Sequence, residues 1–158
     1  MMGKSRVCLL LLALLLAVAL VPVRAGDIDL EIGALLALGN TVASLGELKT
    51  DPFDPTIEYF EAENAISFSG IVVGEWQLLL SGEDFVSGAD RIPLEQMEWK
   101  LRGGTYRRMP ARGRYQEIMR VSGLLKIFSD NLSFRLVLKG DESPGRYNNL
   151  LTLTLVYL

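Results

Sequence analysis

The sequence predicts an all-β protein behind a short N-terminal leader, and three observations support this prediction. From residue 26 onward, apolar and polar residues repeatedly alternate with a period of two, while the 3.6-residue spacing of amphipathic helices is scarce. Turn signals that contain Gly or Pro separate these alternating runs. The first 25 residues differ from the rest, because they combine a basic start with a long apolar run.

Residues 1–25 have the composition of an export signal. Of these 25 residues, 19 are hydrophobic, three are basic and none is acidic. Lys4 and Arg6 supply the positive start, residues 7–20 the apolar run, and Val23-Arg24-Ala25 a small-x-small ending that predicts cleavage at its end. A membrane-spanning helix needs ~20 apolar residues, and this run is shorter. We therefore expect a cleaved signal peptide and no stable membrane span after cleavage.

The remaining chain, residues 26–158, has the length of one domain. Three of the 16 basic residues lie in the leader, so the mature chain has 13 basic and 19 acidic residues and a net charge of −6. This acidic balance argues against nucleic-acid binding. The sequence has no His, and its one Cys, Cys8, lies in the leader. We therefore expect no His- or Cys-based catalytic residues, no imidazole or thiolate metal site and no cofactor.

The first expected strand covers residues 27–38, where Asp27, Asp29 and Glu31 begin the polar face. The alternate positions on the other face are apolar: Ile28, Leu30, Ile32, Ala34, Leu36 and Leu38. Residues 34–45 are also compatible with a short helix. An alternating strand at the mature terminus could swing out and complete the sheet of another copy, which makes 27–38 a candidate donor strand. The alternative is the ordinary first strand of its own domain, since intramolecular pairing avoids the entropy cost of association.

Seven further alternating runs are expected. They begin near Ile57, Ile66, Trp76, Met97, Ile118, Leu132 and Leu151. The turn signals around them are Asp51–Pro55, Ser69-Gly70, Ser81-Gly82, Ser87-Gly88, Arg102-Gly103-Gly104, Ser122-Gly123 and Ser143-Pro144-Gly145. A single sheet this apolar would leave one face wet. We therefore predict an antiparallel two-sheet sandwich of immunoglobulin-like type, with about 7–8 strands in one domain.

Trp76 and Trp99 each lie in an alternating run with apolar neighbours two residues away. This pattern predicts burial between the sheets. The alternative is a platform that stacks on sugar rings, which would require exposed indoles.

The segment 102–115 is the densest charged feature of the chain, with five arginines, two tyrosines and no acidic residue. Arginine forms paired hydrogen bonds with phosphate and carboxylate groups, and tyrosine stacks on flat ligands. The candidate ligand- or partner-binding residues are Arg102, Tyr106, Arg107, Arg108, Arg112 and Arg114. The alternative is a solvated hairpin connection. On an acidic protein, this basic segment could also meet the acidic face of a neighbouring copy.

The acidic residues concentrate around 51–63 and 83–90. Calcium prefers such oxygen-rich loops, but neither segment has the Asp-x-Asp-x-Asp-Gly spacing of a specific calcium site. We interpret both segments as solvated edges and assign no metal ligand.

The order of features over residues 57–158 resembles that of secreted bacterial β-sandwich proteins of the surface and fibre, or fimbrial-type subunit, kind. The features are Ser67-Phe68-Ser69, Gly74-Glu75-Trp76-Gln77-Leu78, Gly82-Glu83-Asp84-Phe85, Ile92-Pro93-Leu94, Trp99 before Gly103-Gly104, Phe134-Arg135-Leu136, Pro144-Gly145-x-Tyr147 and Leu151-Thr152-Leu153-Thr154-Leu155. The triplets Trp76-Gln77-Leu78 and Trp99-Lys100-Leu101 are also similar to those of cell-wall-binding WxL domains. The resemblance implies an extracytoplasmic structural or adhesive module.

These observations lead to one functional expectation, a non-enzymatic exported structural or adhesive surface protein that can self-assemble as a fibre- or pilus-type subunit. The alternative is a soluble extracytoplasmic module that binds carbohydrate or protein. The expected partners are other copies of the chain, through strand exchange, or other surface proteins and polysaccharides. The expected location is secreted or extracytoplasmic, on the cell surface or in the periplasm.

The leader yields a direct prediction. The exported protein should begin at Gly26, because the short apolar run and the Val23/Ala25 pair favour cleavage there. Intact-mass measurement of the exported protein checks this. Recovery of uncleaved chain in a membrane fraction would contradict it.

Overall fold

The computed structural model describes residues 33–158. The expected leader, residues 1–25, and residues 27–32 of the expected first strand lie outside this range. The described part is all-β, and its only helical element is one 3-10 turn. Among its residues, no helix has the length and apolar character needed to cross a membrane.

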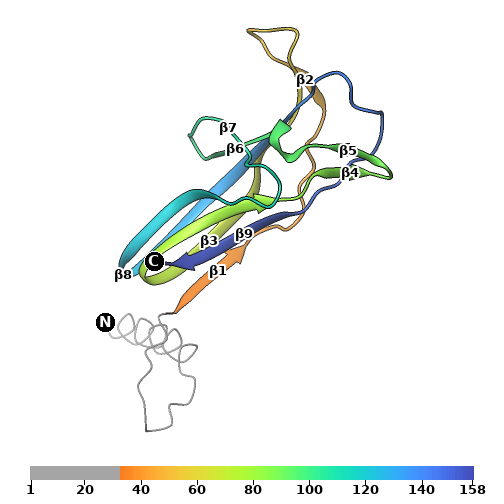
Figure 1. Ribbon diagram of the computed structural model, residues 1–158. Helices are drawn as coiled ribbons and strands as arrows, with labels where there is room; N and C mark the ends of the chain where they lie inside the picture. Colours follow the sequence, from red (N-terminus) through yellow and green to blue (C-terminus); the bar gives the residue numbers. More distant parts are fainter. Residues whose placement is uncertain (1–32) are drawn as a thin grey trace, which may run out of the picture. The chain divides into compact units, whose positions relative to one another are not determined.

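Nine strands and the 3-10 turn make up the described part (Figure 1). In chain order they are β1 (Ala34–Leu38), β2 (Leu48–Thr50), β3 (Glu58–Gly82), β4 (Phe85–Ser87), β5 (Asp90–Ile92), η1 (Leu94–Gln96), β6 (Met97–Leu101), β7 (Arg107–Arg108), β8 (Gln116–Val137) and β9 (Leu151–Tyr157). Seven strands form one antiparallel sheet, in which β3 and β8 are central. The β4–β5 hairpin forms a separate two-stranded sheet.

Strands β3 and β8 are much longer than the runs expected from the sequence. Three expected runs, beginning near Ile57, Ile66 and Trp76, merge into β3. The runs near Ile118 and Leu132 merge into β8. The expected turns at Ser69-Gly70 and Ser122-Gly123 therefore lie inside strands. Gly70 and Gly123 therefore do not end a strand, and their roles are a close packing contact and a bend.

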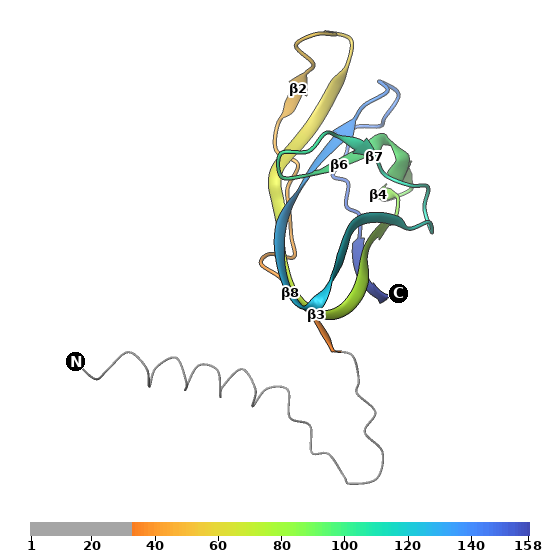
Figure 2. The same ribbon diagram turned by 90° about the vertical axis from the view of Figure 1, so that its left-hand side faces the viewer.

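Gly74 and Gly123 lie opposite each other and mark a sharp bend in the β3–β8 pair. Their φ angles are 96° and 155°, values that side chains disfavour, and the register shifts between Val72 and Gly74. Figure 2 shows both strands turning at this point, so that one sheet forms two arms facing each other. We call residues 58–72 and 126–137 the first arm, and residues 74–82 and 116–122 the second arm.

Gly70 permits close packing within the first arm. It lies opposite Phe128 on β8 and Leu36 on β1. A Cβ atom at this position would lie 2.6 Å from the carbonyl oxygen of Leu35 and would also overlap the Phe128 ring. Glycine therefore lets the Phe128 ring lie across β3, where it also packs against Phe68 at a centroid distance of 6.4 Å.

The core fills the space between the two arms. Its buried residues come from β3 and β8, from the β4–β5 hairpin with η1, and from the β6–β7 segment. They are Phe68, Val72, Leu78, Leu80, Phe85, Ile92, Leu94, Met97, Trp99, Met109, Ile118, Val121, Phe128, Leu132, Phe134 and Leu136.

Trp99 links the two arms. It lies opposite Phe134 in the first arm and is only 2% exposed. Its Nε1–H donates a 3.0 Å hydrogen bond to Oε1 of Gln116, which pairs with Leu80 in the second arm. The predicted burial of Trp99 is thus confirmed. Trp76 is only half-buried at the margin of the core, where it makes an edge-to-face contact with Tyr157 at 5.3 Å.

The two tryptophans should contribute unequally to stability. Trp99→Ala should lower the free energy of unfolding by about 3–5 kcal/mol, because it leaves a cavity between the arms. Trp76→Ala should lower the free energy of unfolding by less than half as much, because Trp76 is only half-buried. Urea unfolding of the mature chain measures both values. Trp99→Phe is included because it keeps much of the volume and removes the hydrogen bond to Gln116. Equal losses for both alanine variants would contradict the assignment.

Candidate functional site: the open edge of the sheet

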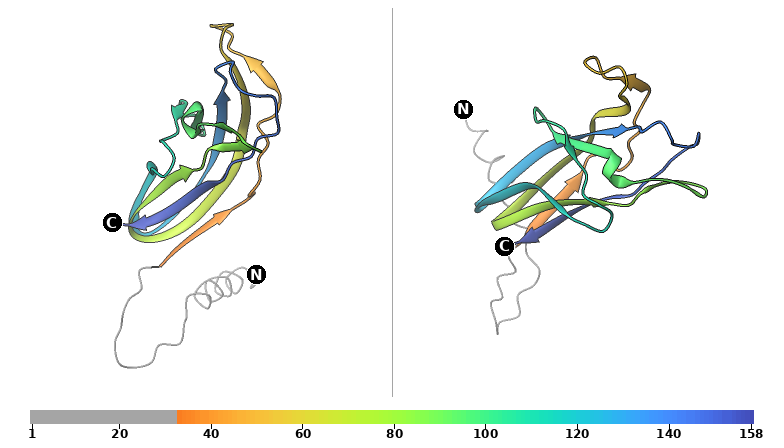
Figure 3. Two further views of the ribbon diagram at one scale, coloured as in Figure 1. Left: turned by 45° about the vertical axis from the view of Figure 1, so that its right-hand side comes forward. Right: turned by 45° about the horizontal axis from the view of Figure 1, so that its top comes forward.

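Strand β3 is covered along both of its edges. Strand β8 follows one edge over almost its full length. The other edge is covered in succession by β2, β1 and β9, and Figure 3 shows β1 and β9 beside β3. Between β2 and β1 the side chain of Asn40 takes the place of a strand, since it accepts a 3.1 Å bond from the Ser67 N–H and donates to the Ala65 carbonyl.

Strand β8 differs, because much of its second edge has no neighbouring strand. On that edge it pairs only with β6, from Leu132 to Leu136. Over residues 116–131 no strand of the described chain pairs with it there. Figure 1 shows β8 on the outside of the sheet, with β3, β9 and β1 following on its other side.

The second-arm part of this edge carries charged side chains. Glu117 and Arg120 form an ion pair at 3.0 Å, and Arg120 also lies 3.6 Å from Glu75 on β3. The hydrogen bond from Arg120 lowers the pKa of the Glu117 carboxyl. Charged residues on an edge strand disfavour pairing with another strand.

The remaining part of this edge, residues 124–131, carries exposed apolar side chains and is called the open stretch. Its sequence is Leu-Leu-Lys-Ile-Phe-Ser-Asp-Asn. The side chains of Leu124, Leu125 and Ile127 are 95%, 67% and 70% exposed. Ile127 lies in register with Ile71 on β3 and Leu35 on β1, which is also exposed, so an apolar row crosses three strands. The open stretch therefore combines an unpaired edge with an apolar surface.

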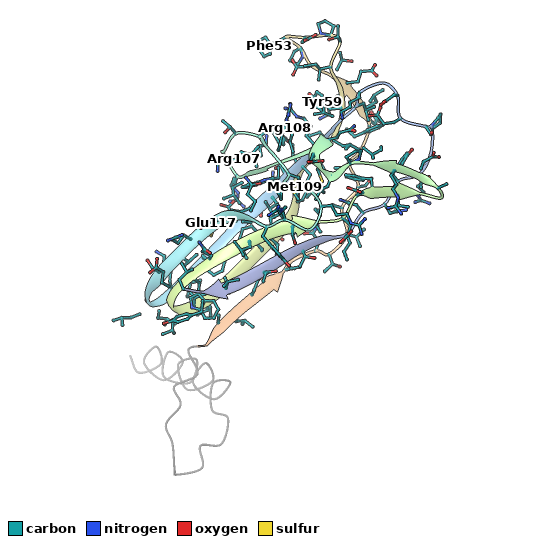
Figure 4. All side chains as sticks on the ribbon, in the orientation of Figure 1. Phe53, Tyr59, Arg107, Arg108, Met109 and Glu117 are labelled. Atoms are coloured by element: carbon teal, nitrogen blue, oxygen red, sulfur yellow. The ribbon has the colours of Figure 1, made fainter. Side chains whose placement is uncertain are left out.

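The six sequence-derived candidates of the segment 102–115 do not form one cluster. Arg107 lies opposite Trp99, with its guanidinium 6.0 Å from the indole centroid, and so faces the core side of the sheet. Arg108 lies opposite Glu98 on the outer face. Figure 4 labels both arginines next to Met109. The alternation of β7 separates two neighbours that the sequence treats as one patch.

The other four candidates lie in different surroundings. Arg112 forms an ion pair with Glu83 at 2.5 Å, and Arg114 is exposed in the loop before β8. The N–H of Arg102 donates a 3.2 Å bond to Oδ1 of Asp130, at the end of the open stretch. Tyr106 is half-buried on the outer face of the sheet.

A charged ladder crosses five strands on this outer face and was not predicted from the sequence. Four of its residues lie in one register row, namely Glu61 on β3, Arg135 on β8, Glu98 on β6 and Arg108 on β7. The fifth, Lys49 on β2, lies opposite Tyr59 and reaches Glu61 diagonally. Lys49 lies 2.9 Å from Glu61, and Arg135 lies 2.5 Å from Glu98. The ladder alternates in sign, which favours this strand order.

Two tyrosines enclose Arg135 within the ladder. Its guanidinium carbon lies 5.1 Å from the Tyr59 ring centroid and 4.5 Å from that of Tyr106. The Tyr106 hydroxyl donates a 2.6 Å hydrogen bond to Glu61. Because these groups satisfy one another, the ladder holds β2, β3, β8 and β6 together and offers few free polar groups to a ligand.

The pKa values of this cluster follow from its contacts. Burial alone would raise the pKa of the Glu61 carboxyl, but the hydrogen bonds from Lys49 and Tyr106 more than offset it, and the pKa lies below its ordinary value. Burial, followed by the hydrogen bond to Glu61, raises the pKa of the Tyr106 phenol. The fold therefore favours ionised Glu61 beside a neutral Tyr106.

Two shallow depressions lie on the described surface. The larger, about 330 Å³, is lined in part by Asp90, Arg91 and Glu142. Glu142 organises its own loop there by accepting bonds from the N–H groups of Lys139 and Gly140 at 2.8 and 2.9 Å. No group of three or more acidic side chains in the described range is arranged to hold a metal ion.

The smaller depression, about 190 Å³, lies beside the open stretch. Its lining combines Gly39 and Phe68 with six polar residues, namely Arg102, Ser67, Ser69, Ser129, Asp130 and Asn131. Of the predicted arginine candidates, Arg102 is the one that contributes to this depression.

The donor-strand candidates fall into two groups. Ala34, Leu36 and Leu38 belong to β1, which pairs with β3 of its own chain. Ile28, Leu30 and Ile32 lie outside the described residues. Residues 39–45, for which a helix was an alternative, form a loop after β1.

Comparison with known proteins identified no relative, since no protein-family model, no curated protein and no solved structure matches this chain.

The ladder yields a prediction about pH. Glu61→Gln should lower the free energy of unfolding by about 1–2 kcal/mol at neutral pH, because it removes the charge that accepts bonds from Lys49 and Tyr106. A carboxyl with a lowered pKa stabilises the fold above its unfolded pKa and loses this contribution as the pH falls through the folded value. The difference between variant and wild type should therefore shrink as the pH falls below the ordinary pKa of a glutamate carboxyl.

Urea unfolding at neutral and acidic pH measures this difference. The control is Glu95→Gln, since Glu95 is exposed in η1. It should change little at either pH. A Glu61→Gln deficit of equal size at both pH values would show that packing, not charge, explains the loss.

Proposed function

We propose that this protein is a non-enzymatic, exported structural or adhesive surface protein that assembles by pairing of sheet edges. The observation that supports the proposal best is the open stretch, residues 124–131 of β8. Its second edge has no partner strand in the described chain, and its outward side chains Leu125 and Ile127 are largely exposed.

The physical argument concerns backbone hydrogen bonding. An edge strand presents unpaired N–H and C=O groups that another strand can satisfy. Natural edges are commonly protected by charge, and Glu117 and Arg120 can provide this in the second arm. The open stretch has two charged residues of opposite sign, Lys126 and Asp130, and its other six residues are uncharged. An exported protein that retains such an edge is suited to strand pairing.

The proposal includes three expectations from the sequence. Cleavage of residues 1–25 would deliver the mature chain outside the cytoplasm. The two arms, which face each other across one core, would serve as the immunoglobulin-like sandwich. The resemblance of residues 57–158 to fibre and surface subunits agrees with assembly as the role.

A second candidate function is a soluble extracytoplasmic module that binds carbohydrate or protein. The observation that favours it is the smaller depression, whose lining includes Arg102 together with Ser67, Ser69 and Ser129. Guanidinium and hydroxyl groups suit an anionic saccharide. Loss of glycan-array binding in Arg102→Ala, with binding kept in Arg146→Ala, would favour this function over assembly.

The test of assembly is the mass of the purified mature chain in solution, measured at several concentrations by analytical ultracentrifugation. We expect a concentration-dependent shift to larger species. Leu125→Lys should raise the protein concentration needed for this shift at least tenfold, because it places a further charge on the open stretch. Leu150→Lys is the matched control, since Leu150 is equally exposed, at 67%, but lies before β9. A chain that remains monomeric throughout would contradict the proposal.

A further inference from the structure

We infer that the open stretch pairs antiparallel with the open stretch of a second copy, about a two-fold axis at Phe128. This inference rests on the proposed function and specifies its interface. The sheets of the two copies would then join across β8.

The structure limits which residues can pair. Strand β6 covers the edge of β8 from Leu132 onward, so an incoming strand must stop before that residue. At the other end, Gly123 bends β8 away from the line of the first arm. A straight strand can therefore extend only over residues 124–131.

The alternation of side chains restricts the register further. In an antiparallel pair, opposing residues point to the same face of the sheet. Phe128 is buried on the core face, and the exposed Ile127 points to the outer face. In a two-fold pair one residue must therefore oppose its own copy, and the two choices nearest the middle of the stretch are Ile127 and Phe128.

Charge favours the axis at Phe128. With this register, Lys126 opposes Asp130 of the second copy, and the symmetry forms this ion pair twice. With the axis at Ile127, Lys126 would oppose Phe128 and Asp130 would oppose Leu124, so both charges would face apolar residues. Opposite charges in directly opposed positions stabilise an antiparallel pair, whereas an unpaired charge gains nothing.

The same register also covers apolar surface. Ile127 of each copy opposes Ser129 of the other, and the two Ile127 side chains become diagonal neighbours on the outer face. The apolar rows of the two copies, each made of Leu35, Ile71 and Ile127, would then lie offset by two residues and meet through the diagonal Ile127 pair. The pairing thus gives hydrogen-bond partners to the free backbone N–H and C=O groups of the open stretch and also reduces the exposed apolar area.

Disulfide trapping tests the register directly. The mature chain has no cysteine, so introduced cysteines are its only thiols. The double variant Ile127→Cys/Ser129→Cys places opposed thiols within disulfide range. On mild oxidation, most of the protein should become covalent dimer. The single variant Ile127→Cys should cross-link several-fold less. A more efficient cross-link through Ile127→Cys alone would place the axis at Ile127 and overturn the inference.

A charge exchange provides a second test. Lys126→Asp should weaken association at least tenfold, because each copy then opposes an acid with an acid. Adding Asp130→Lys to the same chain should restore it. Since Asp130 also accepts a bond from the Arg102 N–H, thermal melting confirms that each variant is folded. Failure of the double variant to recover association, with the fold intact, would contradict the ion pair.

The outcomes separate the inference from the proposed function. A monomeric wild-type chain would overturn both. Assembly that persists in Lys126→Asp, and is lost on deletion of residues 27–38 from a chain that thermal melting shows to be folded, would retain the proposed function and replace this interface with strand exchange. Assembly that is affected neither by Lys126→Asp nor by the deletion would place the interface elsewhere and would also overturn the inference.

Discussion

The rest of the structure depends on the bend that Gly74 and Gly123 permit in the β3–β8 pair. Without this bend, two long antiparallel strands would form a flat ribbon whose apolar face is exposed to solvent. The bend turns this ribbon into two arms, so one sheet encloses its own core. Trp99 then fills the space between the arms and bonds across it to Gln116, which fixes how the arms face each other.

The bend also explains why one edge stays open. Strand β6 pairs with β8 only at Leu132–Leu136, in the first arm. The charged ladder around Arg135 holds β6 at this place on the outer face. Residues 124–131 of β8 have no neighbouring strand on the edge away from β3 within the described chain. The same packing that completes the core therefore leaves the open stretch as the surface available for assembly.

The sequence predicted the strand content because period-two alternation identifies strands locally, and it placed Trp99 in the core for the same reason. It did not predict the length of β3 and β8, because glycine in a bend or beneath an aromatic ring has the same sequence signature as glycine in a turn. The ladder depends on the register of five strands, which a single sequence does not encode locally. The separation of Arg107 from Arg108 could have been inferred, since neighbours on a strand point to opposite faces.

Amide hydrogen exchange over residues 124–131 tests the central claim most directly, because it reports whether this edge is unpaired in the monomer and paired in the assembly. In dilute protein, the amides that point away from β3 should exchange within seconds to minutes, far faster than those of Leu78 or Phe134. At concentrations where assembly is complete, they should be protected at least a hundredfold more, while the rest of the sheet changes little. Equal protection at both concentrations would contradict the account.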